Sequence, residues 1–285
     1  MMGHMACRVL GATHDVVGTI RGDWNPDSPL ASFLGAGSCV SGLDVLDSEA
    51  VARVLDEVEP DAVLNCVGIV KQLSAAKDAV ASIECNSLLP HRLALLTVPR
   101  DVRLIHLSTD CVFSGRDGEY SEDDVPDPVD LYGRSKLLGE IGPEEGLTIR
   151  TSIVGRQIAG ATSFFEWILS NRGKTVQGFE RAVYSGLTTM ALSRIVSRIL
   201  DQHPTLGGVW QVASEPITKF ELIVRLNDLL DLKIDVVSDA TFVCDRSLDG
   251  SRFVARTGLV TPNWDSMLAD FALDQSAYPA TETTR

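Results

Sequence analysis

The sequence predicts an α/β fold built on a doubly wound parallel sheet, with a smaller α/β lobe toward the C-terminus. Short apolar segments alternate along the chain with longer segments of helical pattern, as in strand–helix–strand units. Polar residues follow directly after the buried segment Leu104–Leu107, at the place where open α/β sheets hold their ligands. With 285 residues, 45% of them hydrophobic, the chain is long enough for one large core with an appended lobe.

The first half of the chain is predicted to alternate strands with helices. Met1–Leu10 has the pattern of the first turns of a helix, and residues 22–42, rich in Gly, Pro and Ser, form a loop or weak helix. Helix Glu49–Val58 takes Asp47 or Ser48 as its N-cap, because short polar side chains satisfy the free amides of a first turn. The remaining predicted elements here are strand His14–Arg21, strand Ala62–Gly68, helix Ser82–Leu96 and strand Leu104–Leu107.

The second half continues the alternation. Asp130 is the predicted N-cap of a helix that opens with Tyr132–Lys136, and the polar tail Asp274–Arg285 is predicted to fray. The other predicted elements are strand Leu147–Gly155, helix Ala191–Gln202, strand Gly207–Ala213 and helix Phe220–Leu230. We expect residues 1–155 and 183–205 to form a dinucleotide-binding domain, and residues 156–182 and 206–285 to form a substrate lobe.

Charge and composition exclude several classes of function. The formal net charge of −14 argues against a nucleic-acid or anionic-membrane partner, since these require a basic surface. The six cysteines are scattered without metal-ligand spacing, so we expect reduced thiols and no metal site. No apolar run has the length of a membrane span, and we predict a cytoplasmic protein. A homodimer is the default expectation for such an enzyme.

Tyr132, Lys136 and Thr109 are the residues that together suggest a reaction. Tyr132 and Lys136 are four apart and share one helical face. A free phenol, with a pKa of about 10, is a poor proton donor and acceptor at neutral pH, and a nearby cation lowers that value. Thr109 adds a neutral hydroxyl that could hold a carbonyl oxygen against the phenol. The pattern therefore predicts proton transfer to or from a carbonyl compound.

These residues resemble a known family, the extended short-chain dehydrogenases/reductases, and within it the group of dTDP-4-dehydrorhamnose reductases. The resemblance is carried by Ser108–Phe113, Tyr120–Asp123, Tyr132–Lys136 and Gly139-Glu140, and it extends over nearly the whole chain. It implies a Rossmann-type fold and a catalytic triad of Thr109, Tyr132 and Lys136. It also implies a sugar-nucleotide substrate and a role in the biosynthesis of dTDP-rhamnose or another deoxysugar.

The same resemblance places the cofactor. Arg21 ends the second strand of the family order, where an arginine suits the 2′-phosphate of NADP and an acidic residue would suit NAD. NADP(H) is therefore the predicted cofactor, with NAD(H) as the alternative. The cofactor-binding residues implied by the family are Gly3, Arg21, Asp44, Val45, Asn65, Cys66, Val67, Tyr132 and Lys136.

The start of the chain departs from the family pattern. Met1–Met5 corresponds to the end of the glycine-rich cofactor motif, and Gly3 would be its third glycine. The first two glycines and the first strand of the doubly wound sheet are not among these residues. Because that strand is central and pairs on both sides, we expect a start placed too far downstream or a shortened chain.

Several residues are expected on the substrate side. Arg150 could meet a diphosphate or be a plain surface cation, and Asn86 could be an active-site amide or a helix-face residue without a role. The predicted substrate-binding residues are Asn86, Thr109, Asp110, Arg150 and Tyr184.

The function predicted from these residues is NADPH-dependent reduction of a 4-keto-6-deoxysugar nucleotide. One alternative is an epimerase of the same superfamily. Dehydration ranks low, because Cys111 stands where the dehydratases carry a glutamate after the aspartate. The other alternative is a regulatory subunit without catalysis, like the regulatory subunit of methionine adenosyltransferase, which resembles this reductase group.

Overall fold

The computed structural model describes residues 1–34, 39–71, 78–158, 160 and 162–278. Its main sheet is parallel, with strand order β3-β4-β5-β9. A second, parallel pair is formed by β1 and β2. The strands are β1 (Gly18–Thr19), β2 (Cys39–Val40), β3 (Ala62–Asn65), β4 (Arg103–Leu107), β5 (Leu147–Arg150) and β9 (Gly208–Gln211). The predicted α/β fold with a parallel sheet is confirmed.

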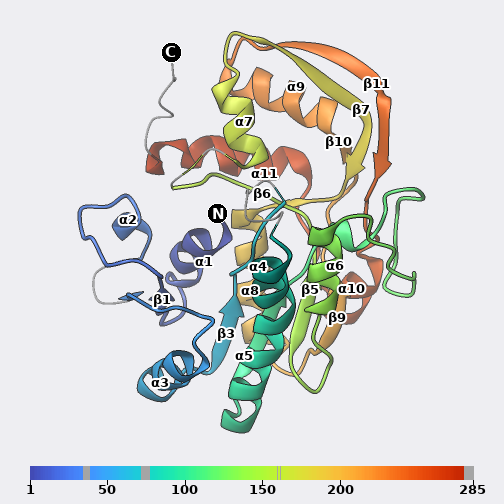
Figure 1. Ribbon diagram of the computed structural model, residues 1–285. Coiled ribbons are helices and arrows are strands. Elements are labelled where there is room, and N and C mark those ends of the chain that lie inside the picture. The colour runs from blue at the N-terminus through green and yellow to red at the C-terminus, as the bar shows by residue number, and fades with distance from the viewer. Residues whose placement is uncertain (35–38, 72–77, 159, 161, 279–285) are drawn as a thin grey trace.

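The two sheets are separate in the part of the chain that the structure describes. There β1 pairs only with β2, and β3 pairs only with β4. In Figure 1 the β1–β2 pair lies to one side of β3, with helix α2 (Ala31–Leu34) beyond it. This arrangement agrees with the expectation that the central strand of the doubly wound order is not among these residues.

Helices cover both faces of the main sheet. Ile105 on β4 belongs to a core that includes Leu10 of α1 (Met2–Leu10) and Ile195 of α8 (Thr189–Gln202). Leu104, the preceding residue, belongs to a separate core with residues of α3 (Ser48–Val58) and α5 (Leu89–Thr97). Successive side chains of a strand point to opposite faces, so this division shows that the sheet is doubly wound.

A smaller lobe lies at one end of the molecule, at the top of Figure 1. In its sheet, β7 pairs antiparallel with β10 and parallel with β11. A short pair, β6 with β8, lies below this lobe in the same view. The elements are β6 (Ile153–Val154), α7 (Phe164–Ser170), β7 (Thr175–Tyr184), β8 (Leu187–Thr188), β10 (Ile217–Thr218), α9 (Lys219–Leu230) and β11 (Asp235–Asp245).

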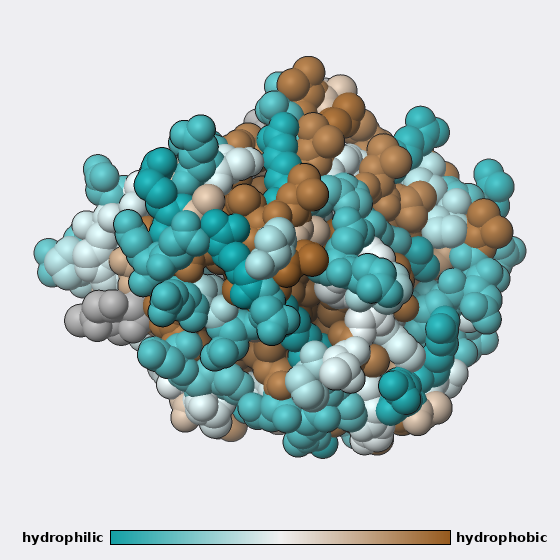
Figure 2. Space-filling model, turned by 90° about the horizontal axis from the view of Figure 1, so that it is seen from below, coloured by the Kyte–Doolittle hydropathy of each residue, from teal (hydrophilic) through white to brown (hydrophobic). Residues whose placement is uncertain are grey.

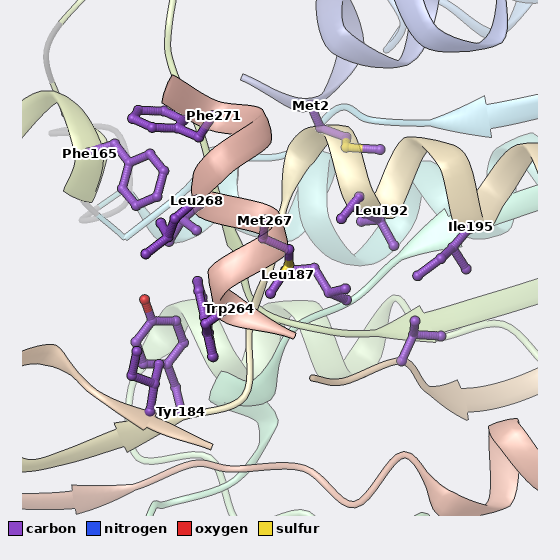
Figure 3. Packing of buried hydrophobic residues seen from close by; sticks show 14 of the residues in the cluster. Met2, Phe165, Tyr184, Leu187, Leu192, Ile195, Trp264, Met267, Leu268 and Phe271 are labelled. Carbon is purple, nitrogen blue, oxygen red and sulfur yellow. The ribbon is translucent and has the colours of Figure 1, made fainter. Parts of the chain in front are cut away.

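Helix α11 (Trp264–Leu273) joins the lobe to the main core, and α10 (Ser251–Thr257) precedes it. Figure 3 shows Trp264 of α11 beside Tyr184 and Met267 beside Leu187. The rings of Tyr184 and Trp264 meet edge to face with centroids 5.8 Å apart. Both ends of the chain therefore contribute to one continuous core, because Met2 belongs to the same cluster as α11.

The predicted helix Ser82–Leu96 is interrupted. The structure has α4 (Ala79–Ser82), a π-helical turn η2 (Ile83–Leu88), α5 and the 3₁₀ turn η3 (Val98–Arg100). Pro90 has no amide hydrogen to donate to the carbonyl of Asn86 four residues earlier. That carbonyl oxygen lies 2.0 Å from where a Cβ on Gly139 would be, so a neighbouring helix approaches closely at this turn. The irregular turn is thus a point of contact between two helices.

Two predicted strands are shorter than expected. His14–Arg21 forms a strand only at Gly18–Thr19, and Leu147–Gly155 is divided into β5 and β6. The division follows pairing, because β5 ends beside β9 whereas β6 pairs with β8. The pattern of apolar residues alone does not predict which other strand a segment will pair with.

The C-terminal tail is ordered further than predicted. It forms η5 (Asp274–Ala277), in which Asp274 makes an ion pair with Arg8 of α1. The hydroxyl of Tyr278 lies 3.1 Å from Nε2 of His4, and both side chains are buried. The expectation of a frayed tail is wrong for Asp274–Tyr278, and residues 279–285 lie outside the described part of the chain.

Apolar side chains also reach the surface. In the view of Figure 2, hydrophobic residues interrupt an otherwise mostly hydrophilic face. Val80 of α4, Leu95 of α5 and Leu138 of α6 (Leu131–Leu138) are 67%, 74% and 65% exposed. Singly exposed apolar groups are normal on protein surfaces, so they do not test the expected homodimer, which stays a prediction.

Candidate active site

Strand β4 ends at the reactive residues, as predicted. Thr109 is 6% exposed and begins the 3₁₀ turn η4 (Asp110–Val112) as its N-cap, accepting the amide hydrogen of Cys111 at 3.2 Å. Its hydroxyl donates to Oδ1 of Asp110 at 3.1 Å. The side chain of Thr109 is therefore held by its own turn at the carboxyl end of the sheet.

Helix α6 carries the other two members of the predicted triad. Asp130 is its N-cap, accepting from the amide of Gly133 at 2.9 Å, as predicted. A Cβ on Gly133 would lie 2.1 Å from the carbonyl oxygen of Cys111, so only glycine lets α6 approach the turn after β4 this closely. This approach brings Tyr132 within hydrogen-bonding reach of Thr109.

Tyr132 is protonated at neutral pH. Burial raises the pKa of its hydroxyl above the ordinary value, Cys111 adds to the effect, and the hydrogen bond with Thr109 opposes it. A phenol that keeps its proton is a donor, so this site can give a proton to an oxygen that gains charge.

Lys136 lies deeper than a surface lysine. It is 5% exposed, donates to the carbonyl oxygen of Leu107 at 2.6 Å, and places Nζ 3.3 Å from Nε2 of His106. Burial lowers the pKa of its amine to about 8, although Cys85 and Glu140 raise it. The expectation that Lys136 lowers the pKa of Tyr132 is not met in this arrangement, because the lysine amine is held against β4 and burial dominates at the phenol.

Asp110 and Tyr184, both predicted on the substrate side, lie near one another. Asp110 is 7% exposed, and burial raises the pKa of its carboxyl while the charge of Arg246 lowers it. The Tyr184 hydroxyl is buried and has no hydrogen-bond partner. Sequence reasoning did not place Arg246 here. It follows β11, more than a hundred residues after Asp110, and no local spacing links the two.

Arg150 is placed differently from either expectation. It is 5% exposed, and its Nε and Nη2 donate to the two carboxylate oxygens of Glu140 at 2.9 and 2.8 Å. The Ser108 hydroxyl donates to the same carboxylate at 2.7 Å. Arg150 is thus not a surface cation, because its buried guanidinium is paired with Glu140. Its buried Nη1 has no hydrogen-bond partner, and the contact with a diphosphate stays a prediction.

Asn86 has a structural task. Its amide nitrogen donates to the carbonyl oxygen of Ile69 at 3.0 Å and to the Ser135 hydroxyl at 3.1 Å. Its amide oxygen accepts from the Ile69 amide at 2.8 Å. The side chain is 1% exposed and joins the segment after β3 to α6. Its hydrogen-bonding groups contact the protein itself, so the predicted contact with substrate is not seen here.

The residues predicted to select the cofactor come together at the ends of β1 and β2. Arg21 follows β1, and its side chain is 85% exposed, with one nitrogen 3.5 Å from a carboxylate oxygen of Asp44. Asp44 also accepts the amide hydrogen of Leu46 at 3.1 Å. Val45 is partly buried against the core beneath α3. An exposed guanidinium at this strand end is free to meet an anion.

The other predicted cofactor residues lie where α1 meets the end of β3. A Cβ on Gly3 would lie 3.7 Å from Cβ of Cys66. Burial raises the pKa of the Cys66 thiol to about 12. Asn65 turns its side chain inward, accepting from the Val67 amide at 3.0 Å and contacting Nδ1 of His106 at 3.1 Å. Any contact that Asn65 makes with a cofactor is therefore indirect.

The described residues hold neither a metal centre nor a membrane span. No group of three or more His, Cys, Asp or Glu side chains among them is arranged to hold a metal ion. No helix among them is long and apolar enough to cross a membrane.

A doubly wound parallel sheet with polar residues at the carboxyl ends of its strands defines a Rossmann-type fold. Residues 30–213, more than half of the chain, match the family described as RmlD substrate binding domain. The chain belongs to this family.

Two curated relatives show its range. The chain is 32% identical over 185 residues to the probable low-salt glycan biosynthesis reductase Agl14 of Haloferax volcanii, covering 61% of this chain and 60% of that protein. It is 24% identical to methionine adenosyltransferase 2 subunit beta of Rattus norvegicus, covering 67% and 60%. The chain thus spans about 60% of the length of these two relatives.

Solved structures show the same fold over most of the chain. A hypothetical dTDP-4-dehydrorhamnose reductase from Sulfolobus tokodaii has a TM-score of 0.73 at 26% identity, covering 91% of this chain and 92% of that one. A dTDP-4-dehydrorhamnose reductase from Bacillus anthracis, solved in complex with NADP, has a TM-score of 0.72 at 20% identity, covering 83% and 90%.

Proposed function

We propose that this chain is an NADPH-dependent reductase of a sugar nucleotide that converts the C4 carbonyl of a 4-keto-6-deoxysugar to an alcohol. The observation that carries the proposal is the nearness of Tyr132 to Thr109, beside the buried Lys136. The family membership and the reductases among the relatives support it. We further propose a cytoplasmic enzyme of deoxysugar biosynthesis.

The residues present fit a phosphorylated dinucleotide. Arg21 offers an exposed guanidinium for a 2′-phosphate, at the strand end where such cofactors are distinguished. Asp44 and Val45 lie beside it for the adenosine, and Lys136 would hold the nicotinamide ribose. When bound, the nicotinamide supplies the hydride. NADP in the Bacillus anthracis structure supports this choice over NAD.

The protein groups supply the proton and the orientation. The Thr109 hydroxyl and the Tyr132 phenol would both contact the carbonyl oxygen, and Tyr132 would donate its proton as that oxygen becomes an alkoxide. The raised pKa of Tyr132 keeps this proton in place until charge develops on the oxygen. Buried Asp110 and Tyr184 border the same site, and Arg246 partly balances the charge of Asp110.

We place the sugar nucleotide between the sheet edge and the smaller lobe, which residues 156–182 and 206–285 would provide. The main sheet, with residues 1–155 and 183–205, would hold the dinucleotide. In Figure 1 the smaller lobe lies across the end of the sheet at which β4 and β5 finish. Ligands of open α/β sheets bind at that end.

Turnover with a defined substrate tests the proposal. The purified chain would be titrated with NADPH, and NADPH consumption would then be followed with dTDP-4-dehydrorhamnose. We expect binding of NADPH and consumption that depends on the 4-keto sugar nucleotide. Absence of NADPH binding would show that the cofactor assignment is wrong.

The second candidate is a regulatory subunit that keeps the fold without catalysis. The likeness to methionine adenosyltransferase 2 subunit beta favours it, as does the Lys136 amine, which contacts Leu107 and His106. The same experiment separates the two. NADPH binding without turnover of any 4-keto-6-deoxysugar nucleotide would favour the regulatory subunit.

A further inference from the structure

A line of buried polar side chains runs behind the catalytic lysine. His106 on β4 is 0% exposed and lies opposite Asn65 of β3 in the strand register. Its Nδ1 is 3.1 Å from the amide nitrogen of Asn65, and its Nε2 is 3.3 Å from Nζ of Lys136. The imidazole thus connects a neutral amide to the one titratable cation of the predicted triad.

The orientation of the Asn65 amide determines which nitrogen of His106 carries the proton. The Val67 amide donates to Oδ1 of Asn65 at 3.0 Å, so the NH₂ group of Asn65 faces the imidazole. An NH₂ group only donates, and Nδ1 of His106 must therefore accept. Burial is the largest cause that holds the pKa of His106 well below its usual value, so the ring is neutral. Its single proton lies on Nε2.

An N–H group on Nε2 points at the lysine nitrogen. An ammonium has three donors and no acceptor, so it would face this N–H without a hydrogen bond. A neutral amine can accept from it and still donate to the Leu107 carbonyl oxygen at 2.6 Å. Only the neutral amine of Lys136 can form hydrogen bonds with both neighbours, accepting from Nε2–H of His106 and donating to the Leu107 carbonyl oxygen.

We propose that Asn65 and His106 are positioning residues that favour the neutral amine of Lys136 over its ammonium, through the Nε2–H tautomer of His106. The pKa of Lys136 is lowered to about 8, chiefly by burial, which is the same direction, and the amine becomes the main form above that pH. The other titratable groups that face Lys136 are Cys85 of η2 and Glu140 after α6, and both favour the ammonium. The consequence for catalysis rests on the proposed function. Departure of Lys136 from His106 would favour the ammonium beside Tyr132.

The substitution Asn65→Asp tests the proposal. A carboxylate keeps an oxygen for the Val67 amide but presents an acceptor, in place of a donor, to Nδ1 of His106. The proton of His106 is then expected on Nδ1, and Nε2 becomes an acceptor for the Lys136 ammonium. ¹⁵N NMR of the imidazole reads the tautomer, with the His106 signals assigned by their loss in His106→Phe. ¹³C NMR of the lysine Cε reads the Lys136 pKa.

In the unsubstituted protein we expect the proton on Nε2, and in Asn65→Asp we expect it on Nδ1 with a Lys136 pKa higher by about one unit. The matched control is Asn65→Asp in a His106→Phe background, where the carboxylate acts on Lys136 only through space and the increase should be smaller. An Nδ1 proton in the unsubstituted protein would overturn the proposal. An equal increase with and without His106 would also overturn it.

Neither measurement requires turnover. Failure of the reductase assay would therefore leave this test intact, and a wrong tautomer would leave the reductase proposal standing.

Discussion

At the end of β4 and in α6 the predicted catalytic side chains are buried, whereas Arg21, which follows β1, is almost fully exposed. Lys136 is 5% exposed and His106 is 0% exposed. The side chain of Arg21 is 85% exposed and makes one long contact with Asp44. The four-stranded sheet has strands of four or five residues, and the β1–β2 pair has two in each.

The difference between the two regions indicates that proton transfer needs buried groups and that phosphate binding does not. Proton transfer requires groups whose pKa values are displaced and whose positions are held, and only a desolvated network does both. Selecting a phosphate requires a cation that can reach it, and an exposed arginine suffices. Substitutions in the first region should therefore change chemistry or stability strongly, and those in the second should change only cofactor preference.

The largest effect is expected from Tyr132→Phe. Loss of the hydroxyl removes the proton donor, and turnover should fall by about 10²–10⁴-fold. The ring remains, so the folded structure should persist. NADPH consumption and circular dichroism measure the two quantities. A variant that kept most of its activity would show that the mechanism proposed for Tyr132 is wrong.

The buried ion pair between Arg150 and Glu140 should contribute more to stability than an exposed pair does. Arg150→Met leaves the Glu140 carboxylate buried without its partner, and the free energy of unfolding should fall by about 3–5 kcal/mol. The matched control is Arg100→Met, in a pair with Asp56 whose two side chains are 30% and 62% exposed. That change should cost much less, because an exposed ion pair is screened by solvent. Equal losses in urea denaturation would remove the distinction between buried and exposed regions.

Gly133→Ala probes the close approach of α6. An alanine usually stabilises a helix relative to glycine, but here its Cβ would lie 2.1 Å from the Cys111 carbonyl oxygen. We expect a loss of about 1–3 kcal/mol in the free energy of unfolding and a lower kcat, because Tyr132 moves away from Thr109. Gly142→Ala, whose nearest neighbour would be 3.8 Å away, is the control. A stabilised Gly133→Ala variant would contradict the predicted contact.

The smallest effect is expected from Arg21→Ala in the exposed region. The Kd for NADPH should rise by about tenfold, because one charge-assisted contact to a phosphate is lost, while the Kd for NADH should stay the same. Fluorescence titration with both cofactors measures this. If both dissociation constants rose together, Arg21 would serve the fold or the shared part of the cofactor. Assignment of NADP preference to this side chain would then be wrong.

Much of the fold followed from local pattern. The N-caps Asp47 and Asp130 were predicted from sequence and are confirmed, since capping depends on residues only a few positions apart. The π-helical turn η2 was not predicted. It depends on Pro90 and on the close approach of Gly139, which directly follows α6, and no local pattern indicates that contact. The tail was misjudged for a similar reason, since Tyr278 is buried by His4 at the opposite end of the chain.

The site divides in the same way. Thr109, Tyr132 and Lys136 were predicted to be catalytic from their residue types, their spacing and the family resemblance, and this stays a prediction. The contacts of each side chain could not be predicted from the sequence. Arg150, predicted to face substrate, pairs with Glu140, and Asn86 holds the backbone of Ile69.

By itself, then, the sequence determined the class of sheet and the caps of two helices, and it supplied the prediction of three catalytic residues, all from neighbouring positions. Only the tertiary structure decided which of its charged and amide groups are buried together. The line from Asn65 through His106 to Lys136 joins three elements, β3, β4 and α6. Burial and hydrogen bonding between distant segments set pKa values, and such contacts leave no periodic signal in the chain.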